Sequence, residues 1–166
     1  SAITELFINI DGEVESALRD VAIGSIGAVI IDNSIDLFYP SSGMLVGKYI
    51  RFTLGSNINQ VVRIISYNAI TREITVETGV LTNAIDVGDK FDILKTERIL
   101  FSNIPNQDFL TPSSTSASEV VTVINRHVKN FALTSSNATK IRLMSKIENS
   151  VDSKIYVLGG SANNIL

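Results

Sequence analysis

The chain has 166 residues, of which 45% are hydrophobic and 19% are charged, so it is long enough for one domain or two small ones and too apolar to be disordered. Its formal net charge is −3 and its Lys and Arg residues occur singly, which argues against nucleic acid as a partner. The absence of cysteine excludes disulfides, thiolate metal sites and cysteine nucleophiles. With so few charges to cover the surface, we expect some apolar area to be buried against other subunits.

Membrane and export segments are not expected either. The longest apolar run, residues 26–31, is far shorter than a membrane span. The first residues, SAITELFINIDG, lack the basic start and apolar core of a signal peptide. We therefore expect no membrane partner and no secretion.

The first forty residues predict three short strands and one helix. Residues 6–10 alternate apolar and polar side chains, which predicts a strand that ends at the turn of Asp11 and Gly12. Residues 28–31 and 35–39 predict two more strands, joined by a turn at 32–34. Between the first and the second of these three strands, apolar residues at i, i+3, i+4 and i+7 predict a helix of about three turns. These residues are Val14, Ala17, Leu18 and Val21.

The stretch from 43 to 94 predicts the main β unit. Residues 48–54, 73–77 and 90–93 alternate apolar and polar side chains, as half-buried antiparallel strands do. Residues 60–67 carry branched apolar side chains on both faces, so we expect that strand to be buried on both sides. Four turns separate these segments, at 55–59, at 68–71, near Gly79 and at 88–89. Short strands at this spacing predict a small antiparallel β-barrel or sandwich.

After residue 97 the pattern changes to a mixed one. Segments 99–104 and 109–110 predict a hairpin, and strands are expected at 140–144 and 154–158. Ser116 and Glu119 have the spacing of a capping box, ahead of a helix expected over 117–129. The apolar stripe of that helix consists of Val120, Val121, Ile124 and Val128.

These elements predict a mainly β protein with an α+β part, built as two domains. We expect the first domain, residues 1–97, to be the N-terminal helix with the small β-barrel. We expect the second, residues 98–166, to be a ββαββ unit.

The residues that could carry chemistry are sparse. No paired carboxylates or histidine relay can be assembled, and His127 is the only histidine, so we predict no enzymatic activity and no cofactor. Asp86, Asp89 and Asp92 recur around Gly88 and could suggest a calcium loop. Because Asp92 belongs to a predicted strand, the pattern favours solvated turn carboxylates over a calcium site.

One part of the sequence resembles a known family. The order begins with Gly47, Ile50, Phe52 and Gly55, continues through the run from Gln60 to Val76, and ends with Gly88, Asp89, Phe91 and Ile93. It resembles a β module that recurs in virion proteins of tailed bacteriophages. The closing segment GGSANNIL, residues 159–166, is similar to a motif of phage tail and baseplate proteins.

This resemblance implies a structural virion protein without catalytic activity, which mediates assembly or attachment of tail, baseplate or neck parts. It implies other virion proteins as partners, a trimer or hexamer of the chain, and a place in the virion after assembly in the bacterial cytoplasm. A capsid decoration or head-fibre anchoring protein is the alternative within this class. A carbohydrate- or receptor-binding module is the alternative outside it, and the lack of Trp argues against that module.

Interface residues are predicted on the β unit. We expect them on its outer face and in the loop after its first strand. They are Arg51, Asn57, Ile58, Asn59, Arg63 and Tyr67.

Overall fold

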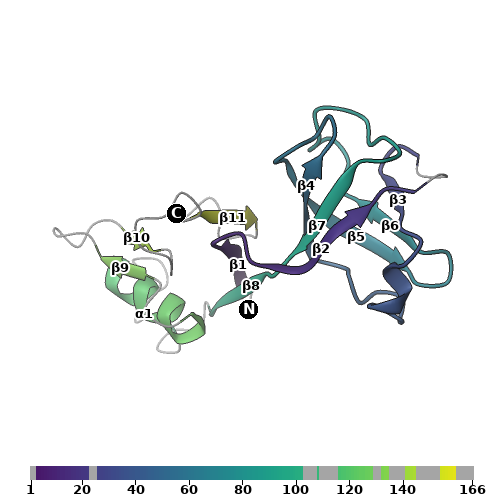
Figure 1. Ribbon diagram of the computed structural model, residues 1–166. Helices are drawn as coiled ribbons and strands as arrows, with labels where there is room; N and C mark the ends of the chain where they lie inside the picture. The colour runs from purple at the N-terminus through teal and green to yellow at the C-terminus, as the bar shows by residue number, and fades with distance from the viewer. Residues whose placement is uncertain are drawn as a thin grey trace. The chain divides into compact units, whose positions relative to one another are not determined.

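The computed structural model of the chain describes residues 3–22, 26–102, 108, 116–128, 132–134, 141–144 and 154–159. Over these residues the protein is mainly β, with antiparallel sheets and an α-helix, as predicted (Figure 1). The chain divides into two compact units. Unit 1 comprises Ser1–Glu13 and Thr96–Leu166, and unit 2 comprises Val14–Lys95. Within the described residues, no helix has the length and apolar character needed to cross a bilayer.

Unit 2 contains a six-stranded antiparallel sheet in the order β2-β7-β4-β5-β6-β3. Its elements are β2 (Val14–Asp20), β3 (Val29–Ile31), the 3-10 helix η1 (Ile35–Leu37), β4 (Tyr49–Leu54), β5 (Val61–Asn68), β6 (Glu73–Val76) and β7 (Lys90–Leu94). The sheet is not closed into the predicted barrel. A backbone hydrogen bond from the Ala22 N–H to the Ile31 carbonyl, at 2.8 Å, connects the segment that follows the edge strand β2 to the other edge strand, β3.

The core of unit 2 follows from the alternation in its strands. Ile50 and Phe52 of β4 are fully buried, and so are Phe91 and Ile93 of β7. β5 departs from the prediction, because Ile65 on its outer face is half exposed and only one face of the strand is buried.

Residues 14–20 form strand β2 and not the predicted helix. Of the predicted apolar stripe, Val21 is buried, but Val14, Ala17 and Leu18 are exposed, Leu18 at 69%, whereas Arg19 is buried. The backbone pairs with β7 in a register that shifts twice, between Val14 and Ser16 and again between Ser16 and Arg19. Leu18 has a positive φ of 54°. These irregularities break the two-residue alternation of a strand, so the sequence imitates a helical period.

Residues 35–39 are also not a strand, since η1 occupies Ile35–Leu37. The Asp32 carboxylate accepts hydrogen bonds from the backbone N–H and the hydroxyl of Ser34, and the Ile35 N–H donates to the Asp32 carbonyl. This side-chain turn favours a tight helical turn over an extended segment.

Unit 1 contains a three-stranded sheet, β11-β1-β8, a two-stranded sheet, β10-β9, and helix α1. Their bounds are β1 (Ile3–Ile10), β8 (Glu97–Ser102), α1 (Ala117–His127), β9 (Ala132–Thr134), β10 (Ile141–Leu143) and β11 (Ile155–Gly159). The predicted capping box is present, because the Glu119 N–H donates to the Ser116 hydroxyl and the Ser116 N–H donates to the Glu119 carboxylate. Leu6 and Ile8 of β1 pack with Ile99, Val123 and Ile124 in one core.

The first thirteen residues group with the C-terminal part of the chain and not with the β unit that follows them. The reason is pairing, because Ile8 of β1 lies opposite Glu97 of β8 and Val157 of β11. One domain boundary after residue 97, as predicted, therefore does not separate the two units. The second half of the expected hairpin, at 109–110, and residues 160–166 of the closing motif lie outside the described residues.

Candidate functional site

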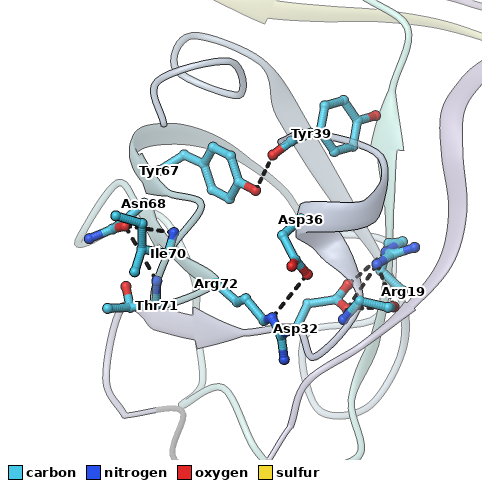
Figure 2. Close-up of polar contacts among 10 residues, drawn as sticks. Arg19, Asp32, Asp36, Tyr39, Tyr67, Asn68, Ile70, Thr71 and Arg72 are labelled. Carbon is cyan, nitrogen blue, oxygen red and sulfur yellow. Dashed lines mark hydrogen bonds and ion pairs between the residues drawn. The ribbon is translucent and has the colours of Figure 1, made fainter. Parts of the chain in front are cut away.

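A buried ion pair holds the centre of a polar cluster in unit 2 (Figure 2). Arg19 binds Asp32 in a bidentate manner, with Nε–Oδ2 at 2.6 Å and Nη2–Oδ1 at 2.8 Å. Arg19 Nη2 also donates to the Ser34 hydroxyl at 2.9 Å, and the guanidinium lies 5.0 Å from the centre of the Phe38 ring. Both charges of this pair are buried and have their partner in the fold, so removal of one would leave the other charge buried and uncompensated.

The turn between β5 and β6 is tied to the segment around η1 by further contacts in the same view (Figure 2). The Tyr67 hydroxyl donates to the Tyr39 carbonyl at 2.5 Å, and Arg72 Nε lies 2.9 Å from Asp36 Oδ1. The Asn68 carboxamide oxygen accepts the backbone N–H of Ile70 at 3.0 Å. The turn is therefore rigid, although its tip, Ile70, is 92% exposed.

Two tyrosines in this cluster resist ionisation. Burial and the neighbouring Glu15 carboxylate raise the pKa of Tyr39 to about 12. Burial raises the pKa of Tyr67 as well. Tyr67 was predicted at an outer contact, but its side chain is only 3% exposed and its hydroxyl donates to the buried Tyr39 carbonyl.

The predicted loop from Asn57 to Asn59 divides into a buried and an exposed part. Asn57 is fully buried, where its amide nitrogen donates to the carbonyls of Asn83 and Ala84 and its oxygen accepts the Asn83 N–H. Ile58 is half exposed, and Asn59 is exposed with a positive φ of 67°. Asn57 therefore fixes the loop. Of the three predicted loop residues, only Ile58 and Asn59 are accessible to a partner.

The two predicted arginines lie on the outer face of the sheet, on neighbouring strands. Arg51 of β4 forms an ion pair with Asp92 of β7, with Nη2–Oδ2 at 3.0 Å. Asp92 also accepts the strained Leu18 N–H at 2.8 Å, so this carboxylate is structural. Arg63 of β5 is exposed. The predicted residues do not converge on one site, because two are buried and the others lie on a loop and on the sheet face.

Two of the three aspartates that could suggest calcium use their carboxylates within the fold. Asp89 is buried and accepts the Asp86 N–H at 3.1 Å, and Asp92 is directed to Arg51. In the part of the chain that the structure describes, no group of three or more His, Asp or Glu residues could hold a metal ion. His127 Nδ1 lies 3.0 Å from the Val123 carbonyl, within its own helix.

No family model, curated protein sequence or solved structure matches the chain. The structure shows what two glycines of the quoted sequence order do in this fold. Gly47 and Gly55 have positive φ values of 85° and 103°, and a Cβ on Gly55 would overlap the Asp89 carboxylate. These motif positions meet requirements of the β fold itself.

Apart from Ile58, the exposed apolar residues in the loops of unit 2 were not predicted from the sequence. Ile70, Leu37 and Phe38 are the most prominent of them in and around the polar cluster. A signal was present, because isoleucine at the tip of a short turn replaces the Gly, Asn or Asp that turns favour. The accessible surface of these loops therefore offers apolar contact and not reactive groups.

Proposed function

We propose that this chain is a structural protein of a tailed-phage virion, without catalytic activity, that mediates assembly or attachment of tail, baseplate or neck parts. The observation that carries the proposal is the set of large apolar side chains exposed on rigid loops of unit 2. Ile70 at 92%, Leu37 at 78% and Phe38 at 61% exposure are among them. Apolar side chains that together form a contiguous patch mark protein interaction sites, and we propose that these side chains contribute to one.

Rigidity of these loops supports an assembly role. The Asn57 contacts and the Asn68 turn hold their loops before any partner binds. Loops already ordered in this way lose little conformational entropy on association, so more of the contact energy remains as affinity.

The use of the polar side chains agrees with the same role. Arg19, Asp32, Arg51 and Asp92 form ion pairs that join different parts of the fold, and Asp89 supports its own turn. Such groups contribute to the stability and shape of the protein, which are the properties that a joint between virion parts requires.

Particle composition tests the proposal. Phage particles purified by density gradient from cells that carry this gene should contain the chain at a fixed ratio to the major tail protein, measured by quantitative mass spectrometry. Antibody-labelled electron microscopy should place it on the tail, baseplate or neck. Particles that lack the chain while the lysate contains it would contradict the proposal, and an abundant cytoplasmic protein of the host serves as the contamination control.

A further inference from the structure

Two loops of unit 2 lie side by side at one end of its sheet. One is the loop of residues 55–60 between β4 and β5, and the other is the loop of residues 77–89 between β6 and β7. The Asn57 amide donates to the carbonyls of Asn83 and Ala84. The Asn83 amide in turn donates to a carbonyl of the shorter loop at 2.8 Å. These contacts join the two loops into one surface.

The longer loop is ordered although it contains no helix or strand. Loops of this length are usually either functional or disordered. Besides the Asn57 contacts, the Gln60 oxygen accepts the Thr82 N–H at 3.0 Å, and the Asp89 carboxylate accepts the Asp86 N–H at 3.1 Å. The loop therefore presents a preformed surface, which loses little conformational entropy when a partner binds.

Large apolar side chains are exposed on these loops and at the end of β4, each between 47% and 56% accessible. We name this set the Ile58 surface, and it consists of Leu54, Ile58, Val80 and Val87. Leu54 pairs with Lys90 across β4 and β7, and the Asp89 carboxylate lies where a Cβ on Gly55 would be. The end of β4 and the turn around Val87 are therefore adjacent.

The Ile58 surface lies at the end of the sheet away from the connections to unit 1. The chain passes between the units at residues 13–14 and 95–96. Val14 pairs with Leu94, so both crossings leave unit 2 where β2 begins and β7 ends. The longer loop ends at Lys90, where β7 begins. The length of the strands therefore separates the surface from both crossings.

The charge of the two loops is negative. They contain Glu77, Asp86 and Asp89 and no Lys or Arg. Asp89 is buried, whereas Glu77 and Asp86 are exposed. The Asp86 carboxylate is not used in the turn, because the hydrogen bonds between Asp86 and Asp89 involve the backbone of Asp86.

Cations next to these loops do not compensate all of this charge. Lys90 forms an ion pair with Asp20, with Nζ–Oδ1 at 3.2 Å. Glu77 lies beside Arg63 of β5, because its N–H donates to the Arg63 carbonyl at 2.9 Å. The charge of Asp86 remains, next to the exposed Val87. The Ile58 surface is therefore apolar with an acidic border, and it favours a partner that carries positive charge.

This chain does not itself offer such a partner surface. Its Lys and Arg residues occur singly in the sequence, and many of them pair with carboxylates of the same chain, among them Arg51, Arg72 and Lys90. Two Ile58 surfaces placed against each other would bring like charges together, which disfavours that contact. A different protein is therefore the better occupant.

We propose that the Ile58 surface binds another protein whose contact face combines apolar side chains with Lys or Arg. The inference rests on the proposed assembly function and adds the chemistry of the partner. The apolar side chains exclude water from the centre of the contact, and the cations of the partner lie beside Asp86 at its border. Such charge complementarity speeds encounter and rejects partners of like charge.

The test uses the purified full chain as bait for a library of random short peptides displayed on yeast. Peptides that bind the wild type should be enriched in Lys, Arg and apolar residues. Ile58→Asp should weaken their binding about tenfold or more, because it places a carboxylate in the apolar centre. Asp86→Lys should also weaken it and reduce its dependence on salt, since it reverses the charge at the border. Flow cytometry at several bait and salt concentrations measures both effects.

Ile65→Asp is the matched control, because Ile65 is half exposed on the outer face of β5 and belongs to neither loop. It should bind the selected peptides as the wild type does. Near-ultraviolet circular dichroism checks that each variant is folded, and Val87→Asp replaces Ile58→Asp if that variant is not.

Several results would overturn the inference. They are a selection that yields no peptides, peptides without an excess of Lys and Arg, and peptides that bind Ile58→Asp as well as the wild type. A dimer of the purified chain that Ile58→Asp abolishes, seen by sedimentation equilibrium, would make a second copy the occupant. None of these results alters the content of purified particles, so failure of this inference and failure of the proposed function are distinguishable.

Discussion

The two units differ in how far apart in the sequence their strand partners lie. In unit 2, every strand pairs with another strand of the same continuous segment, Val14–Lys95, and two of the pairings, β4 with β5 and β5 with β6, join consecutive strands. In unit 1, β1 lies between β8 and β11, which follow it after the whole of unit 2 has intervened. Local pairing pays little loop-closure entropy, whereas the pairing of β1 requires both ends of the chain. Unit 2 therefore forms its sheet within one continuous segment, whereas unit 1 needs a strand that is separated from its partners by all of unit 2.

The largest effect is expected in unit 2, from Asp32→Ala. This change leaves the buried Arg19 guanidinium without its bidentate partner, and breaking a buried ion pair in this way costs about 3–5 kcal/mol. Urea denaturation followed by tyrosine fluorescence measures the loss. Asp36→Ala is the control, because its pair with Arg72 is partly exposed and such pairs contribute about 0–1 kcal/mol. Equal losses in the two variants would contradict the assignment of the buried pair.

The independence of the units is tested by Ile8→Ala and Ile64→Ala. Both side chains are fully buried, Ile8 in the core of unit 1 and Ile64 in that of unit 2. Each truncation should cost about 2–5 kcal/mol. Calorimetry should show two transitions, of which Ile8→Ala lowers one and Ile64→Ala lowers the other. If either variant shifts both transitions together, the units fold as one.

A smaller effect is expected from alanine at two glycines of unit 2. Gly55→Ala combines a positive φ with overlap between the new Cβ and the Asp89 carboxylate, so strain of about 1–2 kcal/mol adds to an overpacking cost of about 1–3 kcal/mol. Gly43→Ala has a positive φ but open space around its Cβ, so only the strain remains. The melting temperature of Gly55→Ala should be lower than that of Gly43→Ala in thermal denaturation. The opposite order would show that Asp89 moves away readily.

At neutral pH the smallest effect is expected from Tyr39→Phe, which removes only a long hydrogen bond of 3.4 Å to Glu15. Its consequence appears in alkali. The Tyr39 phenol ionises near pH 12 in the folded protein and near pH 10 in the unfolded chain. Its contribution to stability is therefore complete below pH 10 and is lost as the pH rises to 12. The free energy of unfolding, obtained from denaturation curves at several pH values between 10 and 12, should fall less steeply with pH for Tyr39→Phe than for the wild type. Equal slopes would contradict the assignment.

The sequence by itself determined the elements whose signals are local. Alternation placed β4, β6 and β7, because a half-buried strand requires it, whereas β5 was recognised by its branched side chains on both faces. The Ser116 capping box placed the start of α1, since its hydrogen bonds join residues three apart. The mainly β class followed from these segments alone.

The candidate surface was only partly predictable. Ile58 and Asn59 were expected at a contact and are exposed, whereas Asn57 and Tyr67 were expected there and are buried. A polar side chain in a loop carries the same local signal whether it faces solvent or binds a distant carbonyl. Only the position of the Asn83 and Ala84 carbonyls decides that Asn57 faces inward.

Tertiary structure alone decided the remaining features. Residues 14–21 have a helical period, yet pairing with β7 and the reach of Arg19 to Asp32 make residues 14–20 a strand. The membership of β1 in unit 1 and the burial of Asn57 have the same origin. Each depends on which distant segment lies opposite, and a local pattern cannot specify this because it records only the spacing of side chains along the chain.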